Sequence, residues 1–311
     1  MISDFIKFVE NEKLKVDSIV ITADRKRYEH NFTTPTRRNV RSLSKTVSAL
    51  GIFKAMEERL FNIDSYVMPF FKSIDIYNES NIQYLSKLQI KHLLCLSIGH
   101  DKSFMLRRNY KALSPEVNNI SYILNRDIVH EPGTFFVYDN AATYLLSALV
   151  EKVTDRPFDE FVYERVLQYL NIEKPKWEKC NQGICLGSTG LYLNNEEVHK
   201  IGLMLLNRGQ YGEKQIVKSS WADSMHKPHI YNADFEKYDN VPNNKLRKIA
   251  YGYHIWVCGD RTEKYPGKHY FGDGAEGQFL IISPEQKMVI SVLSREKNMG
   301  PLVGELSKFI Q

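Results

Sequence analysis

The sequence has little of several features that mark specialised classes of protein. Its 311 residues include only four cysteines, 17 glycines and 11 prolines, and the formal net charge is only +5. The low glycine and proline content excludes collagen-like and low-complexity chains. Hydrophobic residues make up 43% and charged residues 25%, enough apolar surface to offset the entropy of folding, which excludes intrinsic disorder. One large domain, or two lobes that share a site, is expected at this length.

The few cysteines are poorly placed for a disulfide framework or a zinc site. Cys180 and Cys185 are five residues apart, without a nearby paired Cys or His motif, and Cys95 and Cys258 stand alone. Zinc sites normally show closer and repeated ligand spacing. Because disulfides are rare in the cytosol, the cysteines indicate free thiols in a cytoplasmic protein without a metal site.

Long apolar runs and strong charge clusters are also missing. No stretch of about 18 apolar residues occurs, so no transmembrane helix or membrane partner is expected. Residues 2–10 show helical apolar spacing rather than the basic and apolar regions of a signal peptide. The basic residues are scattered, whereas nucleic-acid binders gather them on one face. We therefore expect a cytoplasmic protein that binds neither membrane nor nucleic acid, and the sequence leaves its oligomeric state open.

Strand patterns lie near both ends of the chain and helix patterns lie between them. Two hairpins are predicted. One covers residues 18–32, and the other covers residues 279–293, where residues 283–287 connect two buried strands. Helices are predicted over residues 2–10, 42–60, 140–154 and 302–310. This order predicts a single α/β (α+β) domain over residues 1–311. Residues 1–55 and 200–311 would form an α/β lobe, and residues 56–199 a mainly helical lobe inserted in it.

Ser42 and Lys45 form an S-x-x-K motif in one of these helices. Residues three apart share a helix face, so the hydroxyl and the amine can meet over one pocket. A serine needs a base to act as a nucleophile, and a desolvated lysine can be that base. The motif is weak alone, because the same spacing occurs at Ser294 and Lys297.

Tyr138 and Asn140 form a Y-x-N motif in a distinctive context. A Pro-Gly turn at residues 132–133 and a short extended run precede it, and Asn140 begins the best-defined helix. A loop end before a helix can present a phenol and an amide to a pocket. The sequence therefore offers four candidate catalytic side chains in two separate segments.

Taken together, the motifs resemble the serine β-lactamase-like family, which includes class C β-lactamases, D-alanyl-D-alanine carboxypeptidases, D-aminopeptidases and family VIII esterases. The S-x-x-K signature belongs to penicillin-recognising enzymes. Six segments match the family in order: residues 42–45, 90–99, 131–140, 158–170, 190–209 and 251–256. In the second segment Ile98 stands where serine is usual. The last segment resembles a "Y-G-x-G-W" strand. The resemblance implies a β-lactamase/transpeptidase-like fold, an antiparallel sheet flanked by helices with an inserted helical lobe.

The resemblance also implies a mechanism without a metal or organic cofactor. Ser42 would attack a carbonyl and form an acyl-enzyme, Lys45 and Tyr138 would share the work of the base, and Asn140 would orient Lys45 and the substrate. Backbone N–H groups of Ser42 and Ala275 would form the oxyanion hole. The substrate would be a small molecule or short peptide with an ester, amide or D-amino-acid group.

The third family motif is where the sequence departs. Gly272, Asp273 and Gly274 stand where Lys-Thr-Gly is usual, so a cation is replaced by a carboxylate. Asp273 and nearby Glu276 would repel a substrate carboxylate unless Lys268 or His269 compensates, which favours a neutral ester or amide, or a substrate with a free amine. The predicted substrate-binding residues are Gly272, Asp273, Gly274, Glu276, Ser97 and Trp256. A loop over residues 101–110 is expected near the cleft.

Two other classes remain open from the sequence. The altered third motif and Ile98 are compatible with a catalytically degenerate member that binds or senses a ligand. The mild basic charge is the only support for an anion-binding or nucleic-acid-binding protein that borrows the fold.

Overall fold

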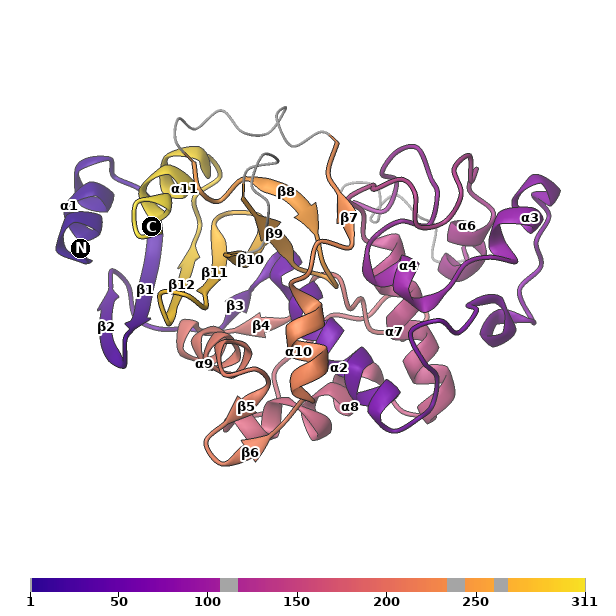
Figure 1. Ribbon diagram of the computed structural model, residues 1–311, viewed down its shortest axis with the longest axis horizontal. Helices are drawn as coiled ribbons and strands as arrows, with labels where there is room; N and C mark the ends of the chain where they lie inside the picture. Colours follow the sequence, from indigo (N-terminus) through magenta and orange to yellow (C-terminus); the bar gives the residue numbers. More distant parts are fainter. Residues whose placement is uncertain (1, 107–116, 234–243, 260–267, 311) are drawn as a thin grey trace.

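The computed structural model describes residues 2–106, 117–233, 244–259 and 268–310. An eight-stranded sheet lies beside a group of helices (Figure 1). The sheet follows the order β2-β1-β12-β11-β10-β9-β8-β7. Its strands are β1 (Val16–Ala23), β2 (Lys26–Asn31), β7 (Ile230–Tyr231), β8 (Lys248–Tyr251), β9 (Trp256–Cys258), β10 (Tyr270–Gly274), β11 (Gln278–Ser283) and β12 (Met288–Ser294).

Every pairing in this sheet is antiparallel, as the family resemblance predicts. The predicted hairpins are β1–β2 and β11–β12, and strand β12 also pairs with β1, so the two ends of the chain meet in the sheet. Ile21, Ile281 and Ile290 lie side by side across these strands. The β-branched, fully buried sequence of β12 suits a central strand.

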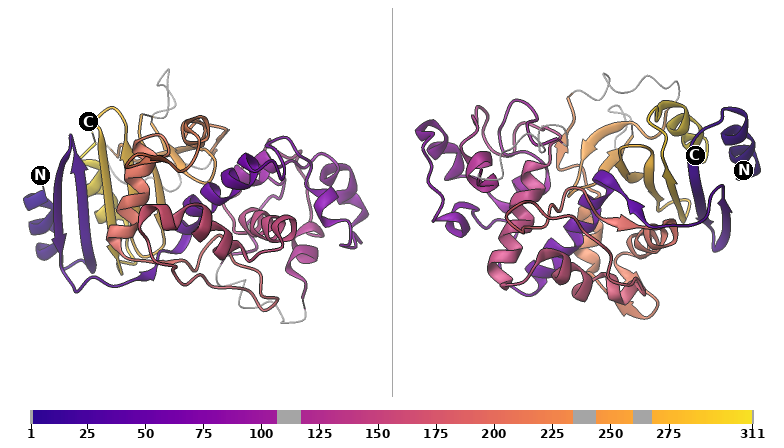
Figure 2. Two further views of the ribbon diagram at one scale, coloured as in Figure 1. Left: turned by 90° about the horizontal axis from the view of Figure 1, so that it is seen from below. Right: turned by 180° about the vertical axis from the view of Figure 1, so that it is seen from behind.

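Helices cover both faces of the sheet (Figures 1 and 2). The terminal helices α1 (Ile2–Asn11) and α11 (Gly300–Ser307) contact each other on one side. Helix α9 (Asn195–Leu206) packs on β1, β11 and β12 from the other side. The apolar positions predicted at both ends of the chain therefore belong to one layered core.

The remaining helices lie beside the sheet, mostly toward the right of Figure 1. Helix α2 packs against α7 and α8, and α4 packs against α7. None of the described helices is both long and apolar enough to span a bilayer. The helices beside the sheet are α2 (Ser44–Glu57), α3 (Ile82–Leu85), α4 (Ile90–Leu94), α6 (Asn119–Leu124), α7 (Ala141–Thr154), α8 (Phe158–Arg165) and α10 (Ser219–Met225). The same part of the chain has 3₁₀ turns at Arg41–Leu43, Met68–Phe71, Glu79–Asn81 and Leu167–Leu170.

Two short strand pairs complete the fold. Strand β3 (Arg38–Asn39) pairs with β4 (Tyr192–Leu193), and β5 (Gln210–Tyr211) pairs with β6 (Lys214–Gln215). The first pair joins the segment before Ser42 to the end of the helical region. The boundaries of the two lobes at residues 55 and 200 stay a prediction.

The predicted strand over residues 251–256 is wrong. Strand β8 ends at Tyr251, β9 begins at Trp256, and residues 252–255 form the turn between them. His254 adopts a left-handed conformation with φ of 58°, which an extended strand cannot contain. The apolar pattern of this segment thus reflects a buried turn rather than a continuous strand.

Candidate active site

The S-x-x-K motif lies where the chain enters α2. Ser42 is in the 3₁₀ turn Arg41–Leu43, and Lys45 is in the first turn of α2. The Lys45 Nζ lies 3.4 Å from the Ser42 Oγ. The helical spacing in the sequence therefore brings the two groups together as predicted.

Lys45 is almost completely enclosed, with 1% of its surface exposed. Its Nζ donates to Asn140 Oδ1 at 2.6 Å and to the Ser188 backbone oxygen at 3.3 Å. Burial lowers the pKa of Lys45 from 10.5 to about 7, although the charges of Asp139 and Asp273 act in the opposite direction. A large fraction of Lys45 is therefore neutral near pH 7 and able to accept a proton.

Asn140 is fixed at the N-terminus of α7, as the sequence predicts. Its Nδ2 donates to the Met105 backbone oxygen at 2.8 Å, which leaves Oδ1 directed at Lys45. The neighbouring Asp139 carboxylate accepts from the backbone N–H groups of Phe104 and Met105. The backbone of Phe104 and Met105 therefore holds Asp139 and Asn140 in place. Residues 107–110 of the predicted loop lie outside the described residues.

The aromatic ring of Tyr138 lies over the Lys45 amine. The Lys45 Nζ lies 5.0 Å from the centroid of the Tyr138 ring, and the Tyr138 hydroxyl interacts with the Ser42 side chain. Tyr138 stacks on Trp256 with ring centroids 5.1 Å apart and planes at 18°. Burial raises the pKa of Tyr138, so the phenol keeps its proton at neutral pH.

The edge of β10 runs beside Ser42. The pairing of β10 with β9 covers Tyr270 and Phe271 and stops before Gly272. A Cβ atom on Gly272 would lie 2.5 Å from Leu43, and one on Gly274 would lie 2.3 Å from the Val40 backbone oxygen. Glycine therefore lets the strand approach the turn that carries Ser42. Within the described residues, the part of β10 after Phe271 does not pair with β9.

Asp273 is held by two donors rather than standing as a lone charge. It is 9% exposed, accepts from Trp256 Nε1 at 2.8 Å, and pairs with Lys248 Nζ at 2.6 Å. The cation paired with Asp273 is Lys248 rather than either residue named from the sequence, since Lys268 is exposed and His269 Nδ1 lies 3.0 Å from Ser283 Oγ. No pattern in the sequence points to Lys248, because strand pairing brings it to the site.

Glu276 is likewise neutralised. Both of its carboxylate oxygens accept from Arg41 Nη2, at 2.9 and 3.0 Å. Arg41 directly precedes Ser42, and the exposed Ala275 lies in the turn that ends β10. The ion pair therefore ties this turn to the entrance of α2, and the role of the Ala275 N–H in the oxyanion hole stays a prediction.

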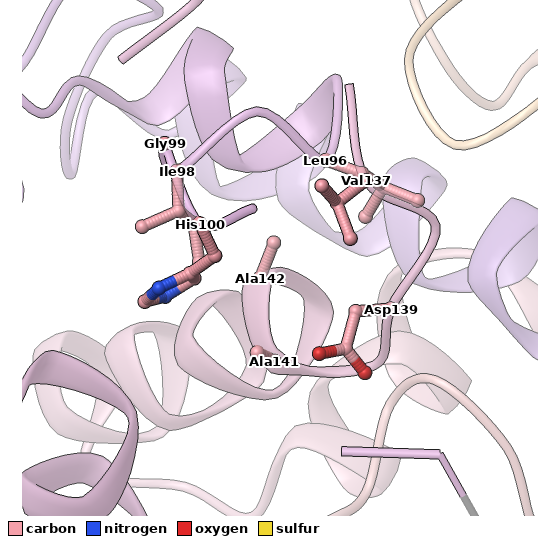
Figure 3. A pocket seen from close by; sticks show the side chains of 8 residues that line it. All are labelled: Leu96, Ile98, Gly99, His100, Val137, Asp139, Ala141 and Ala142. Carbon is pink, nitrogen blue, oxygen red and sulfur yellow. The ribbon is translucent and has the colours of Figure 1, made fainter. Parts of the chain in front are cut away.

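Ser97 lies in a buried segment. It is 1% exposed and donates to the His92 backbone oxygen at 3.1 Å. Its predicted contact with a substrate stays untested. Figure 3 shows a small hollow lined by Ile98, His100, Val137 and Asp139 among others. Ile98 therefore contributes apolar lining to this hollow, in place of the hydroxyl that the family pattern has.

Within the part of the chain that the structure describes, no three His, Cys, Asp or Glu side chains gather to hold a metal ion. The chemistry available at the site is that of a hydroxyl, a buried amine, a phenol and backbone N–H groups.

Comparisons with known proteins concern the family and the fold of the chain. A family model described as Beta-lactamase matches residues 4–310. Protein flp of Staphylococcus aureus is 23% identical over 150 residues, which cover 47% of this chain and 29% of that protein. The match thus spans less than a third of the length of this curated relative.

Solved structures share the fold. The octameric penicillin-binding protein homologue from Pyrococcus abyssi superposes with a TM-score of 0.72 at 19% identity, covering 99% of this chain and 76% of that one. EstCE1, a hydrolase with promiscuous acyltransferase activity, superposes with a TM-score of 0.72 at 15% identity, covering 97% of this chain and 95% of that one.

Proposed function

Because the chain belongs to the beta-lactamase family, we propose that it is a serine hydrolase that forms an acyl-enzyme on Ser42. The observation that carries the proposal is the buried Lys45 amine, 3.4 Å from the Ser42 Oγ and with its pKa lowered to about 7. A lysine of this kind is able to deprotonate a serine at neutral pH.

The proposed reaction moves one proton through two side chains. Neutral Lys45 takes the proton of Ser42 as Oγ attacks the carbonyl carbon, and the N–H groups of Ser42 and Ala275 stabilise the oxyanion. The phenol of Tyr138, which stays protonated because burial raises its pKa, donates its proton to the leaving group and recovers one from Lys45. Neutral Lys45 then takes a proton from a water molecule as the water oxygen attacks the acyl carbonyl carbon, and gives that proton to Ser42 Oγ as the bond to Ser42 breaks and the acid is released.

The charges around the site favour a neutral ester or amide. Asp273 is paired with Lys248, and Glu276 with Arg41, so each pair adds no net charge. The repulsion of substrate carboxylates expected from Asp273 is thereby reduced. Among the described residues, Lys248 is engaged by Asp273 and Arg41 by Glu276, so neither cation replaces the missing Lys-Thr-Gly lysine, and a carboxylated β-lactam gains little attraction from them. We propose short-chain esters and amides as the substrate class.

Labelling with a fluorophosphonate tests the activity. The wild-type protein should gain one adduct, located on Ser42 by intact-mass and peptide mass spectrometry, and Ser42→Ala should gain none. Ser220→Ala is the matched control, because Ser220 is exposed on α10 and its loss should leave labelling unchanged. Labelling that persists in Ser42→Ala would contradict the proposed nucleophile.

A substrate panel tests the substrate class. Short-chain p-nitrophenyl esters should be turned over faster than nitrocefin. D-amino-acid amides form the third group of substrates in the panel. Nitrocefin hydrolysis faster than ester hydrolysis would contradict the preference for neutral substrates. Absence of both labelling and turnover would instead favour a degenerate member that binds a ligand, the alternative to which the altered third motif points.

A further inference from the structure

Two residues beside the proposed oxyanion hole adopt the left-handed conformation, which residues with a Cβ rarely adopt. Arg41, which precedes Ser42, has a φ of 55°, and Glu276, which follows Ala275, has a φ of 69°. Such strained positions persist only where the surrounding structure holds them, and they cluster at functional sites. One strained residue therefore lies next to each of the two N–H groups that the proposed reaction uses.

Hydrogen bonds on both sides hold the backbone of Arg41. Its N–H donates to Asn39 Oδ1 at 2.9 Å, and its backbone oxygen accepts from Ser44 Oγ at 2.6 Å. That oxygen belongs to the same planar peptide unit as the Ser42 N–H. The direction of the Ser42 N–H is therefore fixed through the neighbouring residue.

The turn after β10 is held from the side of the sheet. Gln278 is completely buried, and its Nε2 donates to the Ser294 backbone oxygen at 2.7 Å. The same nitrogen lies 3.4 Å from the Ala275 oxygen and 3.3 Å from the Glu276 oxygen. These contacts connect the turn that carries the Ala275 N–H to strand β12.

The ion pair of Arg41 and Glu276 joins the two strained residues directly. Both carboxylate oxygens accept from Arg41 Nη2, at 2.9 and 3.0 Å. The side chains are only 17% and 30% exposed, so water screens their attraction less than that of a fully exposed pair. The end of β10 and Arg41 are also in close contact, because a Cβ atom on Gly274 would lie 2.9 Å from the Arg41 Cβ.

We propose that Arg41 and Glu276 are positioning residues for the oxyanion hole, whose ion pair sets the spacing between the N–H groups of Ser42 and Ala275. The inference rests on the proposed function, in which these two groups stabilise the oxyanion. Donors stabilise a developing charge best when they are already in place before the reaction. Because the two donors come from segments far apart in the sequence, a direct bond between the segments is needed to keep them in register.

Variants of similar shape test the role of the charges. With p-nitrophenyl acetate as substrate, Glu276→Gln and Arg41→Gln should each lower kcat about 10-fold and leave KM within about twofold, because oxyanion contacts are stronger in the transition state than in the bound substrate. Outright removal of a donor costs more, about 100- to 1,000-fold. The double variant should lose no more than either single variant, since both break the same pair. Losses that multiply in the double variant overturn the inference.

Exchange of the two charges tests for rescue. Arg41→Glu combined with Glu276→Arg restores an ion pair between the same two left-handed positions. Its kcat should return to within about threefold of wild type, whereas each reversal alone places like charges together and should lose more than the glutamine variant. A folded exchange variant as slow as the single reversals overturns the inference. If the exchange variant does not fold, the glutamine variants decide.

The ion pair of Arg208 and Asp223 provides the matched control. Arg208 is also left-handed, with a φ of 53°, and it donates to both Asp223 oxygens at 2.8 and 2.6 Å. This pair joins the chain after α9 to α10 and involves none of the proposed catalytic residues. Asp223→Asn should therefore leave kcat and KM unchanged. A loss of kcat equal to that of Glu276→Gln would overturn the inference, since breaking any such pair would then slow the reaction.

Amide NMR separates this inference from the proposed function, because it needs no turnover. The Ser42 N–H signal should shift in Glu276→Gln and the Ala275 N–H signal in Arg41→Gln, since each substitution lies in the other segment. Both signals should stay in place in Asp223→Asn. Unshifted signals in the folded glutamine variants overturn the inference, even where the wild type hydrolyses the ester. Shifted signals in a protein whose wild type neither labels nor hydrolyses the ester would support the positioning and contradict the proposed function.

Discussion

Lys45 shows at the scale of one residue how burial creates a base. An exposed lysine is protonated at pH 7, whereas this amine is enclosed by α2, the α7 N-terminus and the Ser188 backbone. Its charge lacks the hydration that water would give, so the neutral form is favoured. Burial of this amine lowers the stability of the folded protein, and it provides the neutral base that the proposed activity requires.

Replacement of Lys45 by methionine should therefore raise stability and abolish labelling of Ser42. The unfolded chain binds the Lys45 proton up to its ordinary pKa of 10.5, whereas the folded chain releases it near 7. The wild type consequently gains stability as pH rises from 7 to 10.5. Lys45→Met should be more stable by roughly 1–3 kcal/mol at pH 6–7.

Urea unfolding at several pH values measures this difference. The advantage of Lys45→Met should shrink steadily as pH rises from 7 to 10. A constant difference across this range would show that the amine is not desolvated in the folded protein.

Strand β10 shows at the scale of one element how glycine sets the shape of the site. The strand must pass close to the turn that carries Ser42, and Gly272 and Gly274 provide the space. Between them, Asp273 alternates to the other face of the sheet, where Trp256 and Lys248 hold it. One alternating pattern thus gives close packing on one face and a neutral ion pair on the other.

Gly274→Ala should separate β10 from the Ser42 turn. The added Cβ would lie 2.3 Å from the Val40 oxygen and 2.9 Å from the Arg41 Cβ, so the backbone must shift. A displacement of about 1 Å at a catalytic group can cost about 100-fold in rate, and we expect a loss of this size in the rate of fluorophosphonate labelling.

Gly300→Ala is the matched control, since the nearest atom to its added Cβ lies 3.6 Å away. Its labelling rate should equal that of the wild type. A Gly274→Ala protein that labels at the wild-type rate would show that the β10 edge does not set the position of the reacting groups.

The two ends of the chain cooperate at the scale of the whole molecule. Strands β1 and β12 pair, and Phe5 of α1 meets Phe309 edge to face with ring centroids 6.2 Å apart. These contacts close the layer on the side of the sheet opposite α9 (Figure 2). The terminal helices therefore stabilise the sheet.

Phe5→Ala should destabilise the protein while sparing its chemistry. Truncation of a fully buried phenylalanine costs about 3–5 kcal/mol through lost burial and the cavity left behind. The labelling rate per folded molecule should stay unchanged. Urea unfolding followed by tryptophan fluorescence measures the loss.

Lys7→Ala in the same helix serves as the comparison, because Lys7 is exposed and its removal should change stability by less than about 0.5 kcal/mol. Equal effects of the two substitutions would contradict the packing of α1 in the core.

The sequence by itself determined which reactive side chains lie close together within one segment of the chain. The spacing of Ser42 and Lys45, and the start of α7 at Asn140, follow from helix geometry and turn residues, which act over a few positions. The terminal hairpins also follow from local patterns, and the family resemblance predicted the antiparallel sheet. These features were predictable because neighbouring residues are enough to specify them.

Only the tertiary structure decided the electrostatics of the site. Lys248 meets Asp273 across 25 residues, and Arg41 meets Glu276 across 235, distances in sequence that only strand pairing and packing bridge. The turn at residues 252–255 was missed for the same reason, since its left-handed His254 is held by Leu94 and Thr46 from distant helices. Charge and burial depend on which surfaces meet, and a local pattern carries no information about that.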